Sequence, residues 1–100
     1  MLLLRIEIHP EVYSELEQAR SWYEDRARGL GIKFLDEVDR AINTIRQFPD
    51  TWPPYFEGTR RFLLHRFPFA IVYRHKKNKI QVFALMHLRR KPGYWKERKF

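Results

Sequence analysis

The stretch FAIVYRHKKNKIQVFALMH, residues 69–87, decides the fold of this chain of 100 residues. Two runs rich in aromatic and β-branched residues, 69–75 and 80–87, flank the polar separator 76–79. This composition predicts two strands of an antiparallel meander. The second run is apolar on both faces of the expected strand, which is typical of a central strand in a sheet.

Side-chain alternation assigns the second run to two faces of the sheet. One face would carry Ile80, Val82, Ala84 and Met86, and the other would carry Gln81, Phe83, Leu85 and His87. Because Gln81 is polar, we expect the face of His87 to be less covered and to form the floor of a cleft. In the preceding run, RRFLLHRF at 60–67, alternation puts Arg60 and Arg66 on one side and Arg61 on the other.

The N-terminal half predicts one strand and two helices. Residues 2–8, LLLRIEI, alternate as a strand does, and Pro10 marks a helix start because its missing N–H costs nothing in a first turn. Apolar residues then recur at helical spacing as far as Ala27, and the glycines at 29–31 stop that helix. A second amphipathic helix follows until Pro49, and its polar face would carry Lys33, Asp36, Glu37, Asp39, Arg40 and Arg46.

The predicted element order is therefore β-α-α-β-β-β, and the predicted fold class is α+β. A single domain spanning 1–100 accounts for a chain of this length. We expect a helical hairpin packed on one face of a mainly antiparallel four-stranded sheet, because the apolar stripes of both helices need a common surface to cover. The other face of the sheet would then be open and basic.

The charge of the chain is divided unevenly between its halves. Residues 1–50 hold seven Lys and Arg against ten Asp and Glu, a net charge of −3, whereas residues 51–100 hold thirteen against two, a net charge of +11. This division favours binding of a polyanion such as RNA or DNA, or of an acidic protein.

The opening MLLLRIEIHP is too short and interrupted for a signal peptide or membrane span, which predicts a soluble cytoplasmic protein without a membrane partner.

No cofactor is expected from the sequence. The chain has no cysteine, which excludes a thiolate metal site and a thiolate nucleophile. His9, His65 and His75 lack the spacing of metal ligands. We therefore predict that the protein works without a metal.

Three segments resemble the RelE/ParE superfamily of bacterial type II toxins, also called plasmid-stabilisation proteins. They are the helical ARSWYEDRARGLGIKFLDEVDRAINTIRQFP, the strand pair around RRFLLHRFPFAIVYRH, and the ending IQVFALMHLRRKPGYW. The resemblance implies a toxin held inactive by a cognate antitoxin encoded beside it, and the basic second half predicts an acidic one. Members like RelE cut mRNA inside the ribosome, and members like ParE poison DNA gyrase.

Metal-independent RNA cleavage needs a base for the 2′-hydroxyl, cations for the phosphorane charge, and an acid for the leaving oxygen. His87 can exchange a proton near neutral pH, and Arg66 can hold phosphate oxygens by paired donors. Arg89 and Tyr94 look similar to an arginine and a tyrosine that mRNA-cleaving relatives place after the last strand, at slightly different spacing. The predicted catalytic residues are therefore His87, Arg66, Arg89 and Tyr94.

A second group is predicted to bind RNA or a protein partner: Arg60, Arg61, Arg90 and Lys91. A purely structural or partner-binding role also stays open for several residues near the end of the chain. His87 could be a structural residue at a strand end, with its hydrogen bonds satisfied there. Tyr94 and Trp95 could serve simply to pack the C-terminal segment onto the sheet. The run from Arg89 to Lys91 could serve simply to bind an acidic antitoxin. Because His87, the arginines and Tyr94 together could supply the base, the cations and the acid, the first hypothesis is a ribosome-dependent mRNA endonuclease. The alternative is a non-enzymatic inhibitor of DNA gyrase.

Overall fold

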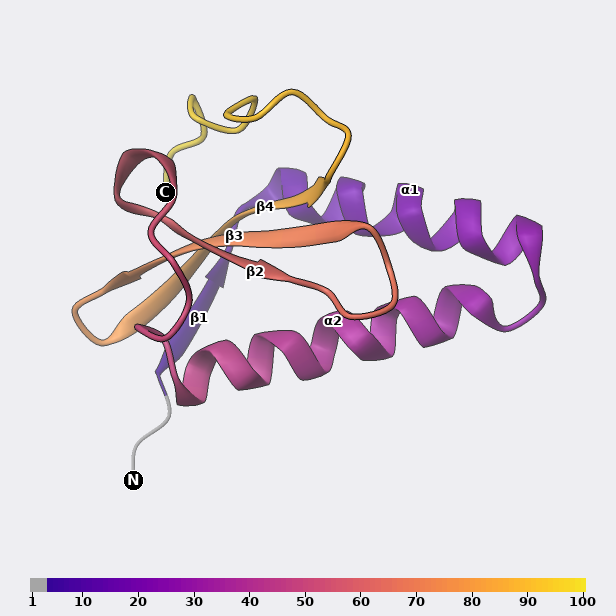
Figure 1. The fold of residues 1–100 in the computed structure, drawn as a ribbon, viewed down its shortest axis with the longest axis horizontal. Coiled ribbons are helices and arrows are strands. Elements are labelled where there is room, and N and C mark those ends of the chain that lie inside the picture. Colours follow the sequence, from indigo (N-terminus) through magenta and orange to yellow (C-terminus); the bar gives the residue numbers. More distant parts are fainter. Residues whose placement is uncertain (1–3) are drawn as a thin grey trace.

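The computed structural model describes residues 4–100, and Figure 1 shows their arrangement. Strand β1 (Arg5–Ile8) precedes helices α1 (Pro10–Arg26) and α2 (Leu30–Gln47). A short 3-10 helix, η1 (Phe56–Gly58), leads into strands β2 (Arg60–Leu63), β3 (Phe69–Lys76) and β4 (Lys79–His87). The predicted order β-α-α-β-β-β is confirmed, and positions 2–3 of the predicted first strand lie outside the described residues.

The strands form one sheet in the order β1-β4-β3-β2. β1 runs parallel to β4, whereas β4 with β3 and β3 with β2 form antiparallel pairs. The sheet is thus mixed, although mainly antiparallel, and β4 has the central position expected for it. The pairing of β1 with β4 ends at Ile8 opposite Val82, so residues 83–87 of β4 extend beyond β1.

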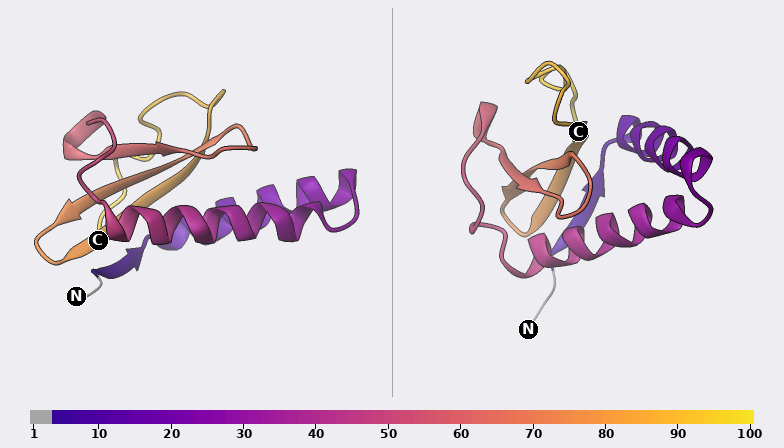
Figure 2. Two further views of the ribbon diagram at one scale, coloured as in Figure 1. Left: turned by 60° about the horizontal axis from the view of Figure 1, so that its bottom comes forward. Right: turned by 45° about the vertical axis from the view of Figure 1, so that its right-hand side comes forward.

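Helices α1 and α2 form a hairpin on one side of the sheet (Figure 2). Gly29 between them has a φ of 83°, a left-handed conformation that residues with a Cβ seldom adopt. The Glu24 carboxylate accepts the N–H groups of Gly29 and Gly31, each at 3.0 Å, and so pairs amides that the start of α2 leaves free. The buried residues of the shared core are Val12, Ala19, Phe34, Val38, Ala41 and Ile45 from the helices, Phe69, Ile71, Tyr73, Ile80, Val82 and Leu85 from the strands, and Leu64 and Phe67 from the connection between β2 and β3.

Strand β4 contains a β-bulge at Phe83. Tyr73 of β3 pairs with Val82, and Val72 pairs with Ala84, so Phe83 has no partner in the ladder. An inserted residue shifts the two-residue period of side chains by one position. The strict alternation predicted for residues 80–87 is therefore wrong beyond Val82.

The bulge changes which residues face the helices. Leu85 packs in the helix-side core, and His87 lines a pocket under α1, whereas Gln81 lies on the other face and donates to Glu7 at 3.0 Å. The prediction that His87 shares a face with Gln81 is therefore wrong. From β4, the side chains that join the cluster on the face away from the helices are Phe83, Ala84 and Met86.

The face of the sheet away from the helices is partly covered. Trp95, in the C-terminal segment 88–100 drawn in yellow in Figure 1, is 1% exposed and packs on this face with Phe83 and Met86. Tyr55, from the connection between α2 and β2, packs against the same cluster. The expectation of an open face is wrong for this part of the sheet, because the C-terminal segment and the connection between α2 and β2 cover it with aromatic side chains. The alternative in which Trp95 packs the C-terminal segment onto the sheet is confirmed.

Candidate functional site

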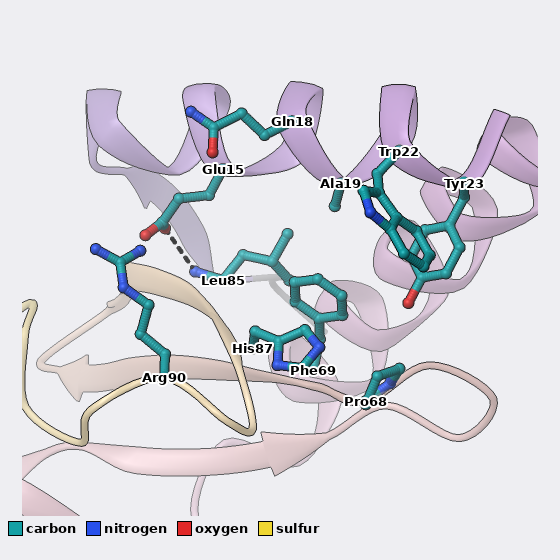
Figure 3. Close-up of a pocket in the computed structure, with 10 residues that line it drawn as sticks. All are labelled: Glu15, Gln18, Ala19, Trp22, Tyr23, Pro68, Phe69, Leu85, His87 and Arg90. Atoms are coloured by element: carbon teal, nitrogen blue, oxygen red, sulfur yellow. Dashed lines mark hydrogen bonds between the residues drawn. The ribbon is translucent and has the colours of Figure 1, made fainter. Parts of the chain in front are cut away.

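A pocket of about 460 Å³ lies between α1 and the carboxyl end of β4 (Figure 3). Helix α1 contributes Glu15, Gln18, Ala19, Trp22 and Tyr23, and the remaining lining residues are Pro68, Phe69, Leu85, His87 and Arg90. Most of this lining is apolar or aromatic, and Trp22 remains 52% exposed. Pockets of this size with a few polar groups in an apolar wall are typical binding sites.

His87 reaches the pocket because the β-bulge turns it toward α1. Its Nδ1 accepts the backbone N–H of Arg89 at 3.0 Å. A neutral imidazole that accepts at Nδ1 carries its proton on Nε2, so Nε2 is a hydrogen-bond donor. The ring packs edge-on against Phe69, with 5.0 Å between the ring centroids, and the side chain is only half-buried.

Arg90 enters the pocket from the turn that follows β4. Its backbone N–H donates to the carbonyl oxygen of His87 at 2.9 Å, which closes the turn. The guanidinium carbon lies 3.9 Å from the centroid of the Tyr94 ring, in a cation–π contact. Figure 3 shows Arg90 at one end of the pocket and Trp22 at the other, with His87 between them.

The Tyr94 hydroxyl is engaged by a carboxylate. It donates to Oε2 of Glu15 at 2.5 Å. Burial raises the pKa of Tyr94, and the bond to Glu15 raises it further. The hydroxyl therefore stays protonated at neutral pH and is held by Glu15. This geometry favours the structural reading of Tyr94.

Glu15 joins three distant parts of the chain. Its Oε1 accepts the N–H of Leu85 at 3.0 Å, and its two oxygens accept from the guanidinium of Arg98 at 3.0 Å each. Arg98 also donates to the carbonyl oxygen of Phe83 at 2.9 Å. These side chains supply hydrogen-bond partners to the part of β4 that extends beyond β1. The side chains of Glu15 and Arg98 are 12% and 14% exposed, so their ion pair is largely buried.

Arg66 lies in the connection between β2 and β3, where Glu37 of α2 holds it. Oε2 of Glu37 accepts the N–H groups of His65 and Arg66, and Oε1 lies 3.3 Å from Nε of Arg66. Burial acts to raise the pKa of Glu37, but the bonds from Arg66 and His65 outweigh it and lower that pKa. The placement of Glu37 on the polar face of its helix is wrong, because it follows Phe34 by three residues and shares its buried side.

Arg60 lies at a different level of the sheet from the pocket. It pairs with Tyr73, whereas His87 pairs with Phe69, four residues earlier in β3. A strand rises about 3.3 Å per residue, so roughly 13 Å separates the two levels.

The structure gathers some of the predicted site residues and separates others. Nη1 of Arg60 donates to the carbonyl oxygen of Trp52 at 2.6 Å, and Arg61 lies over the Tyr55 ring at 4.7 Å. Both arginines are therefore engaged by the connection before β2. Of the predicted residues, His87 and Arg90 line the pocket, and Tyr94 contacts the lining residues Glu15 and Arg90. The predicted residues that do not line it are Arg60, Arg61, Arg66, Arg89 and Lys91.

Residues 4–100 hold neither a metal-binding cluster nor a membrane-spanning helix. Within that range, no three side chains of the His, Asp and Glu type gather closely enough to hold a metal ion. No helix of the described chain is long and apolar enough to cross a membrane.

The family model of the ParE toxin of type II toxin-antitoxin system, parDE, matches residues 6–92. The chain belongs to this family. Toxin ParE2 of Mycobacterium tuberculosis, from strains CDC 1551 / Oshkosh and ATCC 25618 / H37Rv, is 29% identical over 91 residues, which covers 83% of this chain and 80% of the relative. A chain in the solved structure of the chromosomal ParDE TA system from P. aeruginosa matches with a TM-score of 0.73 at 18% identity, covering 86% of this chain and 97% of that one. The resemblance to RelE/ParE toxins is thus confirmed, and this chain is a ParE-type toxin of a toxin-antitoxin system.

Three residues that organise this ParE-type chain were missed by the sequence reasoning. Glu15 and Glu37 both stand on apolar helical stripes, three residues after Val12 and Phe34 respectively. An acidic residue on a core-facing stripe is a signal for a buried, paired carboxylate. Arg98 carries no such signal, because it lies in a charged tail and meets Glu15 only through tertiary structure.

Proposed function

We propose that this ParE-type toxin stops growth as a non-enzymatic inhibitor of DNA gyrase. The observation that carries the proposal is the match of residues 6–92 to toxins of parDE systems. The resemblance links ParE-like members to gyrase and RelE-like members to mRNA, so membership on the ParE side favours gyrase. Its regulator would be the cognate antitoxin, which blocks the toxin by binding.

The positions of the candidate catalytic groups also favour a binding role. RNA cleavage needs a base, cations and an acid around one phosphate. Arg66 is held by Glu37, and the Tyr94 hydroxyl is held by Glu15. The carboxylate in the pocket lining, that of Glu15, is occupied by donors from β4 and the C-terminal segment.

Ribosome-dependent mRNA cleavage is a second candidate, favoured by one observation. His87 and Arg90 line the same partly exposed pocket, and Arg89 follows His87 closely in the chain. In that case Nδ1 of His87 would have to release the backbone N–H of Arg89 before it could take the 2′-hydroxyl proton, and the arginines would bind the phosphate. The partners would then be the ribosome and mRNA.

A supercoiling assay with purified gyrase, relaxed plasmid and ATP tests the proposal. We expect supercoiling to fall as toxin is added, and brief expression in cells to cause double-strand breaks and the DNA-damage response with full-length transcripts. Shortened transcripts with cuts clustered in translated codons, lost on His87→Ala or Arg66→Ala while gyrase stays active, would instead support the endonuclease and reject the inhibitor.

A further inference from the structure

The pocket under α1 combines apolar walls with hydrogen-bond donors. Trp22 and Phe69 provide aromatic surface, and Leu85 provides part of the apolar lining. Nε2 of His87 and the guanidinium of Arg90 are donors without an internal acceptor among the described contacts. A ligand that fits both features has an apolar group next to an oxygen acceptor.

The charge around the pocket selects a negative ligand. Glu15 lies in the lining, but its two oxygens already accept from Leu85, Tyr94 and Arg98. Arg89, Arg90 and Lys91 are exposed just beyond β4, and the guanidinium carbon of Arg26 lies 3.5 Å from the Trp22 ring centroid. Cations therefore flank the pocket at both ends, Arg90 after β4 and Arg26 beside Trp22, which favours a carboxylate on the ligand.

A polypeptide fits these features better than a nucleic acid does. Nucleic-acid binding depends mainly on several cations that contact successive phosphates. Among residues 4–100, Arg90 is the one permanently charged cation that lines the pocket, and the rest of the wall is largely apolar. A side chain of a partner protein would bury apolar surface there, whereas a phosphate would not.

We propose that this pocket binds an apolar side chain from an acidic segment of the cognate antitoxin, whose neighbouring carboxylate is bound by Arg90 and Nε2 of His87. The proposal rests on the assignment of the chain as an antitoxin-regulated toxin. It gives His87 the role of a hydrogen-bond donor in recognition. It is independent of whether the toxin acts on gyrase or on mRNA.

The test measures the affinity of full-length toxin variants for the antitoxin encoded beside this chain, by calorimetry, after thermal unfolding has verified that each variant is folded. Trp22→Ala should weaken binding about thirtyfold, as for an aromatic hot spot, and Arg90→Gln about tenfold. His87→Phe keeps the ring but removes the donor, and should weaken binding about fivefold. Overlapping peptides of the antitoxin give a second readout: the peptide that binds should carry an apolar residue next to Asp or Glu.

Matched controls lie outside the pocket. Tyr13→Ala removes another exposed aromatic residue of α1, and Lys76→Gln removes an exposed cation at the end of β3, so both should keep affinity within about twofold. Affinity within that range for Trp22→Ala and Arg90→Gln would overturn the proposal. Loss of gyrase inhibition or of RNA binding by these variants, with antitoxin affinity unchanged, would also overturn it and assign the pocket to the target. The supercoiling assay on the wild type tests the proposed function separately.

Discussion

At Glu15, one carboxylate of α1 binds the backbone N–H of Leu85, the hydroxyl of Tyr94 and the guanidinium of Arg98. A buried ion pair adds little net stability, because burying both charges removes them from water. Removal of one partner costs much more, because the other charge then stays buried without compensation. The attachment of the C-terminal segment to α1 and β4 therefore depends strongly on this single residue.

Glu15→Gln should lower the free energy of unfolding by about 3 kcal/mol, measured by urea denaturation. The amide keeps the size of the side chain and one acceptor oxygen, but it no longer balances the charge of Arg98. Glu17→Gln, on the exposed side of the same helix, is the matched control and should leave the urea midpoint unchanged. Equal midpoints for both variants would contradict this account of Glu15.

A buried phenol should make stability fall at high pH. The Tyr73 hydroxyl donates to the carbonyl oxygen of Pro49 at 2.7 Å, and burial raises the pKa of Tyr73 to about 12. The phenol of the unfolded chain ionises near pH 10, so the folded state binds this proton more tightly and its stability is lost as pH rises from about 10 to 12. Urea midpoints should fall less steeply with pH in Tyr73→Phe than in the wild type. Tyr13→Phe, at an exposed position, should keep the wild-type slope.

At the scale of elements, strand β4 and the connection between β2 and β3 decide where the candidate groups lie. One unpaired residue, Phe83, turns the end of β4 so that His87 faces α1. Glu37 of α2 holds the connection and fixes Arg66, which does not line the pocket of His87. The sequence shows the types of these residues, but the bulge in β4 and the long-range contacts of Glu37 determine which of them share a pocket.

Glu37 should make the fold sensitive to acid. Hydrogen bonds from Arg66 and His65 lower its pKa despite its burial, so its contribution to stability is present above the unfolded pKa and is lost as pH falls through the folded one. Between about pH 5 and 3, the unfolding free energy should fall less steeply in Glu37→Gln than in the wild type. Asp36→Asn, at an exposed position, is the control. A wild-type slope in Glu37→Gln would show that other carboxyl groups cause the acid sensitivity.

Across the whole molecule, the C-terminal segment completes the fold. It covers one face of the sheet through Trp95 and the free part of β4 through Arg98. Phe100 adds an edge-on contact with Phe83, with 4.8 Å between the ring centroids. The segment, with its positive charges, is thus anchored by Trp95, one of the largest fully buried side chains of the protein.

Trp95→Ala should destabilise the whole domain by about 3 to 5 kcal/mol, because it removes a fully buried indole and leaves a cavity. That loss is a large part of the stability of a domain of this size. Amide hydrogen exchange should accelerate throughout residues 88–100. Trp22→Ala, at a half-exposed position, should change the unfolding free energy far less. Similar losses in the two variants would contradict a structural role specific to Trp95.

Sequence patterns predicted the order of elements, the central position of β4 and the family. These features follow from local preferences: the apolar stripes of the helices, the aromatic and β-branched strands, and the glycines between the helices. The face of His87 was predicted wrongly, because alternation has no means of anticipating a bulge. The open basic face was also predicted wrongly where Trp95 and Tyr55 cover it, because these residues come from segments without periodic patterns.

The sequence by itself thus determined which elements form, in what order, and which chemical groups the second half carries. Only the tertiary structure decided that His87 and Arg90 share a pocket, that Glu15 binds Tyr94 and Arg98, and that Arg60, Arg61 and Arg66 lie elsewhere. The physical reason is one of range. Secondary structure follows from residues a few positions apart, whereas these contacts join residues as many as 83 positions apart, and they form only when strands, helices and tail pack together.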